Sequence, residues 1–304
     1  MSLHVAVLMG GRSVEREVSL VSGEACARAL ESRGYRVSRI DVGADLPIRL
    51  AELRPDRVFN ALHGRMGEDG RIQGLLDLLG LPYTHSGVLA SALAMDKPMA
   101  KRLFTQEGLR CVEGVEATLG SLEHGLPLPA PVVVKPAAEG SSVGVTIILD
   151  DDPRPLFARN DLDRADRVLV ERYIPGRELT SAVMDGRALA VTEILPREGF
   201  YDYRAKYTEG LATHEIPARL SAAVYAQVLD WAVRAHRALG CRGVSRADFR
   251  FNPEEGEAQG LYILEVNTQP GMTPLSLVPE QAAHCGIPFA DLVEWLVQEA
   301  RCDS

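Results

Sequence analysis

The N-terminal third of the chain alternates short apolar runs with helical patterns, and this alternation constrains the fold more than any other feature. Residues 4–11 (HVAVLMGG) form an apolar run that ends in glycines, as a buried parallel strand does. A helical pattern follows at 15–33, and two more strand patterns and a helical pattern extend to about residue 80. Strands that alternate with helices predict a doubly wound α/β domain, which we expect to cover residues 1–95.

The remaining residues predict two domains of mixed α+β character. Residues 96–178 begin with a helix that has a proline in its first turn and continue with strands around a small-residue loop, AAEGSSVG. Residues 179–304 contain two strands around the Asp185-Gly186 turn, a long polar segment at 197–218, an amphipathic helix, two more strands and a final helix. We expect the polar segment to be a loop with a functional role or without fixed order.

Composition excludes several classes of function. The chain has 304 residues and a formal net charge of −9, so it lacks the basic excess that a nucleic-acid-binding face needs. Its five cysteines are scattered without a CxxC pair, which is typical of reduced thiols in the cytoplasm. No stretch approaches the length of a membrane span, and the N-terminus lacks the features of an export signal. We therefore expect a cytoplasmic protein without nucleic-acid or membrane partners.

Two strands near the C-terminus each carry polar side chains on one face. In VSRADFRF (244–251), alternation places Arg246, Asp248 and Arg250 together, and in YILEVN (262–267) it places Glu265 and Asn267 together. The intervening loop allows the strands to pair antiparallel, with their apolar faces in the core. The residues expected on those core faces are Ala247, Phe249 and Phe251 in the first strand and Tyr262, Leu264 and Val266 in the second.

Asp248 and Glu265 need a positive partner, because two carboxylates a few ångströms apart repel by roughly 4 kcal/mol at an effective dielectric of 20. One interpretation is a surface ion-pair cluster with Arg246 and Arg250. The other is a hard divalent cation, most naturally Mg²⁺, held by Asp248, Glu265 and Asn267 together with phosphate oxygens. The hairpin alone slightly favours the ion pairs.

Phosphate-binding features elsewhere in the chain favour the cation. In VVVKPAAEGSSVGV (132–145), Lys135 precedes a Gly/Ser loop whose backbone N–H groups can surround an anion, although the loop is not a Walker A motif. Lys97 lies at a predicted helix start, where the dipole also favours phosphate, and Lys206 lies in the long polar segment. Taken singly, each lysine fits a solvated side chain better.

The segment VERYIPGRE (170–178) has the composition of an adenine-binding strand. Glu171 and Glu178 flank Tyr173 and Ile174, and the segment supplies apolar walls, backbone hydrogen-bonding groups and an acceptor for ribose hydroxyls. An ordinary connection between strands would look similar.

Together these segments resemble the ATP-grasp enzymes and, within them, the D-alanine–D-alanine ligases. The resemblance extends over nearly the whole chain, and the order and spacing of its pieces are highly specific. The pieces are GGRSVEREVSLVSG, ALHGRMGEDGRIQG, LPYTHSGVLASALAMDK, VVVKPAAEGSSVG, FYDYRAKY and LEVNTQPGMTPLSLVP.

The resemblance implies that ATP lies between the central and C-terminal domains. Two Mg²⁺ ions, with Mn²⁺ as an alternative, would be bound by Asp248, Glu265 and Asn267, and Glu265 would bridge them. The residues implied to contact ATP are Lys97, Lys135, Glu139, Gly140, Ser141, Ser142, Val143, Glu171, Tyr173, Ile174, Glu178 and Lys206.

For the amino-acid substrates, the resemblance implies that Glu15 accepts the ammonium of the first D-alanine, with His63 nearby. A triad of Glu15, Ser141 and Tyr207 would link the domains and close the polar segment as a lid. Without the resemblance, Glu15 reads as a residue that favours a helix N-terminus by its charge. His63 reads as a strand-end histidine. The carboxylate of the second D-alanine would be held by Lys206, Ser276 and Leu277.

The implied reaction joins two D-alanines for peptidoglycan synthesis, through an acyl phosphate that one carboxylate forms with the γ-phosphate of ATP. Arg246 and the N–H of Gly271 are the expected donors to the tetrahedral oxyanion. Tyr207 favours a dipeptide product over D-alanyl–D-lactate. Pro274-Leu275 replace more polar residues of some members, which leaves the shape of the second substrate site open. The resemblance also implies a homodimer.

Three other functions compete with this one. A nicotinamide dehydrogenase is disfavoured because no GxGxxG follows the first strand. An ATP-grasp ligase of another acid and amine, such as a D-alanine–D-lactate ligase, is disfavoured by the segment EREVSLVSG (15–23). A non-catalytic nucleotide-binding protein is disfavoured because Arg246 and both metal carboxylates are present.

Overall fold

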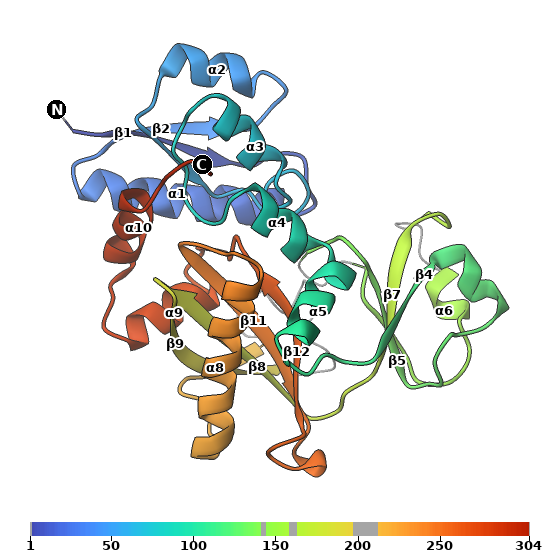
Figure 1. Cartoon of the computed structure of the whole chain (residues 1–304). Coiled ribbons are helices and arrows are strands. Elements are labelled where there is room, and N and C mark those ends of the chain that lie inside the picture. The colour runs from blue at the N-terminus through green and yellow to red at the C-terminus, as the bar shows by residue number, and fades with distance from the viewer. Residues whose placement is uncertain (1, 141–143, 158–162, 197–211, 304) are drawn as a thin grey trace.

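The structure, a computed structural model, describes residues 2–140, 144–157, 163–196 and 212–303. These residues form three β-sheets with helices packed against them (Figure 1). The mixed α/β and α+β fold expected from the sequence is confirmed, including the doubly wound N-terminal part. Among the described residues, none of the helices has the length and apolar character that crossing a membrane requires.

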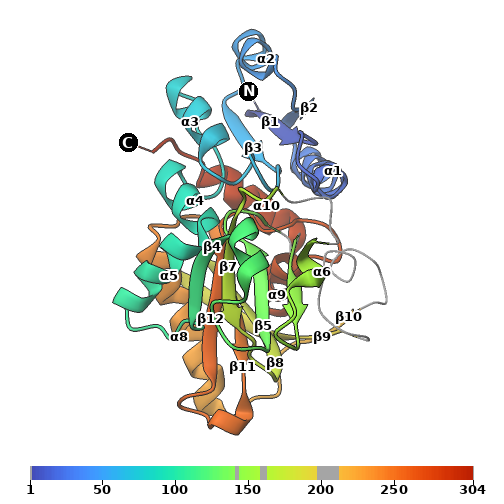
Figure 2. The same cartoon turned by 90° about the vertical axis from the view of Figure 1, so that its right-hand side faces the viewer.

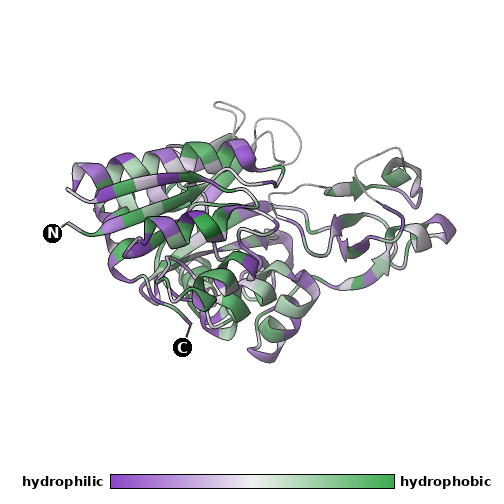
Figure 3. Ribbon diagram, turned by 90° about the horizontal axis from the view of Figure 1, so that it is seen from above, coloured by the Kyte–Doolittle hydropathy of each residue, from purple (hydrophilic) through white to green (hydrophobic). Residues whose placement is uncertain are grey.

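The N-terminal sheet is parallel, with strand order β2-β1-β3. Strands β1 and β3 are buried because helices cover both faces, whereas the edge strand β2 is mostly exposed or half-buried. Figure 3 shows hydrophobic strand residues between the helices of this part of the molecule. Helices α1 (Arg16–Ser32) and α10 (Phe289–Gln298) pack on one face, so the C-terminal helix returns to the start of the chain. Helices α2 (Leu46–Leu53) and α3 (Arg71–Leu78) cover the other face. The strands are β1 (His4–Met9), β2 (Arg36–Asp41) and β3 (Arg57–Asn60).

The second sheet is antiparallel, has the order β4-β7-β5-β6, and forms the lobe that projects from the rest of the molecule in Figure 1. Its core is small and apolar, and residues of the 3-10 helix η1 (Leu119–His124) and of helix α6 (Arg154–Phe157) pack into it. The strands are β4 (Gly114–Thr118), β5 (Val132–Pro136), β6 (Thr146–Ile148) and β7 (Arg167–Arg172).

The third sheet is antiparallel, with the order β10-β9-β8-β11-β12, and it forms the base of the molecule. Its largest core lies under α8 (Ala222–Ala238) and α5 (Lys97–Gln106), while α9 (Leu277–His284) packs against β8 and β9. Figure 2 shows the second sheet standing in front of this one. The strands are β8 (Arg177–Met184), β9 (Arg187–Pro196), β10 (Ala212–Glu215), β11 (Val244–Phe251) and β12 (Leu261–Asn267).

Two details differ from the expectations. The stretch 197–218 was expected to be loop, but β10 (Ala212–Glu215) lies within it and pairs with β9, because an exposed sheet edge offers hydrogen bonds to a polar strand. Helix α5, expected to open the central domain, packs with α8 on the third sheet instead of on the second. The hairpin turn at Asp185-Gly186 is confirmed, and both residues have positive φ, as a type I′ turn requires. Helix α4 (Val88–Met95) links the N-terminal sheet to α5.

Several histidines are buried in these cores and held neutral. Desolvation lowers the pKa of His236 to about 4, and the ring hydrogen-bonds Ser245 through Nδ1 at 2.7 Å. Burial likewise lowers the pKa of His63 to about 4 and that of His85 to about 3. Such residues take up protons on unfolding when the pH lies between the folded and unfolded pKa values.

We expect this burial to weaken the fold at acidic pH. The folded pKa of His236 lies below the unfolded value of 6.5, so the unfolded chain binds more protons and stability falls as the pH drops from 6.5 toward 4. The slope contributed by one such histidine approaches about 1.4 kcal/mol per pH unit. Denaturant unfolding of the wild type and of His236→Gln at several pH values checks this. The difference in stability between them should narrow steadily toward acid, and a constant difference would contradict the prediction.

Candidate active site

A cleft lies where the three sheets meet, and it consists of two connected cavities. The first cavity opens toward the N-terminal sheet and is lined by residues such as Glu15, His63 and Arg246. The second cavity lies between the second and third sheets and is lined by residues such as Lys135 and Ile174. The residues that line both cavities are Lys97, Glu139, Gly140, Glu178, Asp248 and Glu265.

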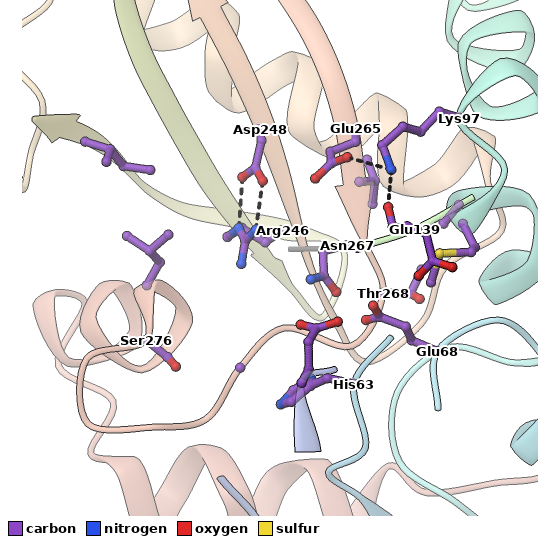
Figure 4. A pocket seen from close by; sticks show the side chains of 18 of the residues that line it. His63, Glu68, Lys97, Glu139, Arg246, Asp248, Glu265, Asn267, Thr268 and Ser276 are labelled. Carbon is purple, nitrogen blue, oxygen red and sulfur yellow. Dashed lines mark hydrogen bonds and ion pairs between the residues drawn. The ribbon is translucent and has the colours of Figure 1, made fainter. Parts of the chain in front are cut away.

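The β11–β12 hairpin supplies the acidic groups at this junction. Asp248 and Glu265 are directly opposed in the antiparallel register, and Asn267 is opposed to Arg246. Figure 4 shows Asp248 and Glu265 side by side, with Asn267 below them and with His63 and Glu68 on the far side of the pocket. The convergence of Asp248, Glu265 and Asn267 on one face is therefore confirmed.

One part of the expected alternation is wrong. Tyr262 and Leu264 were expected in the core with Val266, but they lie on the cleft side, where they pack with Val112 and Ile174. Ile263 takes the core position. The reason is a β-bulge in the ladder beside Asp248, which leaves Leu264 unopposed and shifts the phase of β12 by one residue. Leu264 and Glu265 consequently both line the second cavity.

Ion pairs hold the acidic side chains of the hairpin. Arg246 donates to Asp248 through both Nε, at 2.8 Å, and Nη2, at 2.7 Å, and Thr180 donates to the same carboxylate at 2.7 Å. Lys97 Nζ lies 3.3 Å from Glu265 Oε2 and donates to the carbonyl of Glu139 at 2.5 Å (Figure 4). Of the two interpretations of the hairpin, the ion pair with Arg246 is therefore the one that the structure shows for Asp248.

Arg250 does not contribute to this cluster. Its guanidinium lies 3.5 Å from Glu178 and donates to the carbonyls of Ile174 and Gly176. It therefore braces the wall of the second cavity instead of neutralising the hairpin carboxylates.

The donor set at the hairpin fits a hard divalent cation. Two carboxylates and a carboxamide converge on a partly open face, and the side chains of Asp248 and Glu265 are 13% and 26% exposed. Such oxygen donors suit Mg²⁺ or Mn²⁺ when other ligands complete the shell. Across the part of the chain that the structure describes, no group of three or more His, Cys, Asp or Glu side chains is placed to hold a metal ion by itself. A cation here would need oxygens from a bound molecule.

Buried charges also gather on the wall of the second cavity. Glu171 on β7 pairs with Lys135 on β5 at 2.5 Å and with Lys101 on α5. Burial would raise the pKa of Glu171, but the two lysines hold it below its ordinary value. Burial would lower the pKa of Lys135, yet Glu171 and Glu265 raise it. The second cavity therefore has a charged end. Tyr173 and Ile174, from the connection between β7 and β8, also line this cavity.

The first cavity receives its N-terminal residues from α1 and from the loop after β3. Glu15 is the N-cap residue of α1, is 3% exposed and lines the first cavity. His63 donates from Nδ1 to the carbonyl of Gln269 at 3.1 Å. Because desolvation lowers its pKa to about 4, the imidazole is neutral at pH 7. Glu68 lies close to Glu15, and burial followed by repulsion from Glu15 raises its pKa well above the ordinary value.

The turn after β12 closes the opposite wall of the first cavity. Gly271, Ser276 and Leu277 all line it. A Cβ on Gly271 would lie 2.8 Å from Ser276 Oγ, so the glycine allows a close approach. Ser276 accepts from the N–H of Thr273 at 2.9 Å, which fixes the start of α9. Leu275, from the pair that departs from the family pattern, also lines the cavity.

Five of the expected site residues lie outside the described residues. They are Ser141, Ser142 and Val143 in the Gly/Ser loop and Lys206 and Tyr207 in the long polar segment. The other expected site residues all line one or both cavities.

Comparison with known proteins agrees with this geometry. Residues 49–86 match the family model "D-ala D-ala ligase N-terminus", and residues 116–298 match "D-ala D-ala ligase C-terminus". The D-alanine–D-alanine ligase of Cereibacter sphaeroides is 57% identical over 98% of this chain and 96% of its own. That of Paramagnetospirillum magneticum is 57% identical over the full length of both. The chain belongs to the D-alanine–D-alanine ligase family.

Solved structures support the same assignment. The D-alanine–D-alanine ligase of Bacillus anthracis complexed with ATP superimposes with a TM-score of 0.81 at 32% identity, over 98% of this chain and 96% of that one. VanG D-Ala:D-Ser ligase from Enterococcus faecalis has a TM-score of 0.78 at 28% identity, over 98% and 99%. The ATP-grasp fold expected from the sequence is therefore confirmed.

Sequence reasoning missed three polar residues, one that lines the cleft and two that lie behind its walls. Glu68 lines the first cavity and lies in the glycine-rich segment HGRMGEDG. A carboxylate among glycines directly after a strand is the sequence feature that could have indicated it. Lys101 follows Lys97 by four residues and so shares its helix face. Gln269 is 2% exposed and joins β3 to the β12 turn through Asn60, a contact without a local sequence signal.

Gly140 provides a test of how the two cavities are coupled. A Cβ at this position would lie 2.9 Å from Glu68 Oε1 and 3.3 Å from Glu15 Oε2, so Gly140 itself packs against both carboxylates. Gly140→Ala should push the backbone at residue 140 away from them, at a cost of about 1–3 kcal/mol. We expect KM for both ATP and D-alanine to rise about tenfold or more in steady-state assays.

The matched control is Gly74→Ala in the middle of α3. A Cβ there meets nothing nearer than 4.0 Å. This variant should keep wild-type KM values and match or exceed wild-type stability, because alanine favours a helix. Equal KM values for Gly140→Ala and the wild type would show that substrate binding does not depend on the close approach of Gly140 to these carboxylates.

Proposed function

We propose that this protein joins two D-alanine molecules to D-alanyl-D-alanine at the expense of ATP, which yields ADP and phosphate. The observation that carries the proposal is the opposed Asp248–Glu265 pair beside Arg246, at the junction of two cavities in a chain of this family. One cavity suits a nucleotide, the other suits small amino acids, and the reacting groups would meet between them.

The second cavity is the proposed ATP site. Tyr173 and Ile174 would contact the adenine base. Glu171 would accept a hydrogen bond from its exocyclic amine, and Glu178 would accept hydrogen bonds from the ribose hydroxyls. The phosphates would extend toward Lys97 and Lys135 and under the loop at 139–144, with Lys206 from the polar segment. The ATP complex of the similar B. anthracis enzyme supports a nucleotide in this fold.

Asp248, Glu265 and Asn267 are the residues that would hold the two Mg²⁺ ions. When bound, the metal supplies positive charge that neutralises the transferring phosphate. In that state Arg246 would turn from Asp248 toward the reacting carbon.

The first cavity is the proposed amino-acid site. Glu15 would accept the ammonium of the first D-alanine next to the neutral His63, and the triad of Glu15, Ser141 and Tyr207 would close the lid. Closure excludes water, which is needed because an acyl phosphate hydrolyses readily. The carboxylate of the second D-alanine would be held by Lys206, Ser276 and Leu277.

The chemistry has two steps. A carboxylate oxygen of the first D-alanine attacks the γ-phosphorus, ADP leaves, and an acyl phosphate remains. The amine of the second D-alanine then attacks the acyl carbon, and the tetrahedral intermediate expels phosphate. Its oxyanion would be stabilised by Arg246 and the N–H of Gly271.

We further propose that the protein works in the cytoplasm as a homodimer, in peptidoglycan precursor synthesis. Its five cysteines are free thiols, which agrees with a reducing compartment. The division into domains at 1–95, 96–178 and 179–304 also remains a proposal.

Phosphate release from MgATP tests the function directly. We expect release with D-alanine and little with L-alanine, and mass spectrometry should identify D-alanyl-D-alanine as the product. Mixtures of D-alanine with D-lactate or D-serine determine whether another second substrate is preferred. Absence of D-alanine-dependent release would reject the proposal.

A further inference from the structure

Lys101 is a buried cation that no proposed step uses. It lies on α5, one turn after Lys97, and its side chain is 12% exposed. Its ammonium donates to the carbonyl of Val112 at 2.5 Å and to Oε1 of Glu171. Lys101 does not line either cavity, so it contacts Glu171 from behind.

The surroundings of Lys101 are shaped around this pair. A Cβ on Gly114 would lie 2.9 Å from Glu171 Cγ and 3.2 Å from Lys101 Nζ, so the chain leaves room for the two side chains to meet. The side chain of Glu171 is only 4% exposed. A buried carboxylate in such a place needs a permanent partner, because an unpaired buried charge is strongly destabilising.

The other lysine on Glu171 cannot be that permanent partner if it also binds phosphate. Lys135 contacts Oε2 at 2.5 Å and lines the second cavity, where it would turn toward the nucleotide. That movement would leave Oε2 free to accept a hydrogen bond, while Lys101 keeps Oε1 paired.

We propose that Lys101 is a positioning residue that keeps Glu171 ionised and oriented as the acceptor for the 6-amino group of adenine. The inference rests on the proposed nucleotide site and deepens it, because it assigns the choice of base to a residue outside the cleft. An ionised, correctly oriented carboxylate accepts from a 6-amino purine and repels the oxygen of a 6-oxo purine. Without Lys101, Glu171 takes up a proton or turns away, and this discrimination weakens.

The test compares ADP with IDP by calorimetric binding and ATP with ITP by kcat/KM. Lys101→Met should lower the preference for the 6-amino nucleotide about tenfold in both measurements. This is the effect expected when one charge-assisted hydrogen bond to the base is lost. The matched control is Arg102→Met, which removes an exposed cation from the next position of the same helix and should leave the preference unchanged. Lys101→Arg retains the charge and should stay within about threefold of the wild type.

A second comparison isolates the path through Glu171. If Lys101 acts only through that carboxylate, Lys101→Met/Glu171→Gln should show the same base preference as Glu171→Gln alone. The double variant removes both partners of the buried pair, so a further loss of preference in it can overturn the proposal even when Lys101→Met does not fold. An unchanged preference in folded Lys101→Met, or a further loss in the double variant, overturns the proposal. Nucleotide binding is measured directly, so failure of this inference can be distinguished from failure of the proposed function. The latter would appear as an absence of D-alanine-dependent phosphate release.

Discussion

A Glu265→Gln variant is expected to lose about a thousandfold or more in kcat while keeping its fold. Glu265 stands opposite Asp248 in the hairpin and contacts Lys97 at 3.3 Å, so it joins the proposed metal site to a proposed phosphate ligand. A metal ion contributes several kcal/mol of charge stabilisation, and each 1.36 kcal/mol corresponds to a factor of ten in rate. The glutamine keeps the shape of the side chain and removes only its charge.

The measurement is phosphate release at saturating ATP and D-alanine over a range of Mg²⁺ concentrations. We expect higher metal concentrations to restore little of the activity, because a proposed metal ligand itself is altered. The control is Glu257→Gln, an exposed acid in the loop of the same hairpin. Thermal unfolding should show both variants folded, since the side chain of Glu265 is 26% exposed. Activity within tenfold of the wild type would refute the metal assignment.

The face of β11 could be predicted because each of its residues follows simple alternation. Arg246, Asp248 and Arg250 lie on the cleft side, and the residues between them are buried, as the pattern required. The opposite strand could not be predicted to the same extent. The bulge that moves Leu264 to the cleft depends on how β12 pairs with β11, and strand pairing leaves no trace in the local sequence of one strand.

Charge pairs show the same limit. The position of Lys97 at the start of α5 followed from the sequence, since Asp96 accepts from the N–H of Met99 as an N-cap and a proline occupies the first turn. The contact between Lys101 and Glu171 joins residues 70 positions apart on different elements. Only the packing of α5 against the β-sheets brings these two together.

Replacement of Arg246 by methionine is expected to lower kcat by about 100-fold to 1,000-fold, the usual effect of removing one donor to an oxyanion. The arginine is 12% exposed and held in place by two hydrogen bonds to Asp248. Its loss should slow the attack of the amine more than formation of the acyl phosphate. The intermediate would then hydrolyse before it reacts, and more than one phosphate would be released for each dipeptide formed.

The ratio of phosphate to dipeptide therefore distinguishes two roles of Arg246. Arg246→Lys keeps a positive charge beside Asp248 but provides a single point donor, so its kcat should fall less and its ratio should stay nearer to one. If Arg246→Met releases one phosphate per dipeptide and changes only the metal dependence, the arginine serves to orient Asp248 and not the oxyanion. A raised ratio with unchanged metal dependence assigns it to the second chemical step, because only that step separates phosphate release from peptide formation.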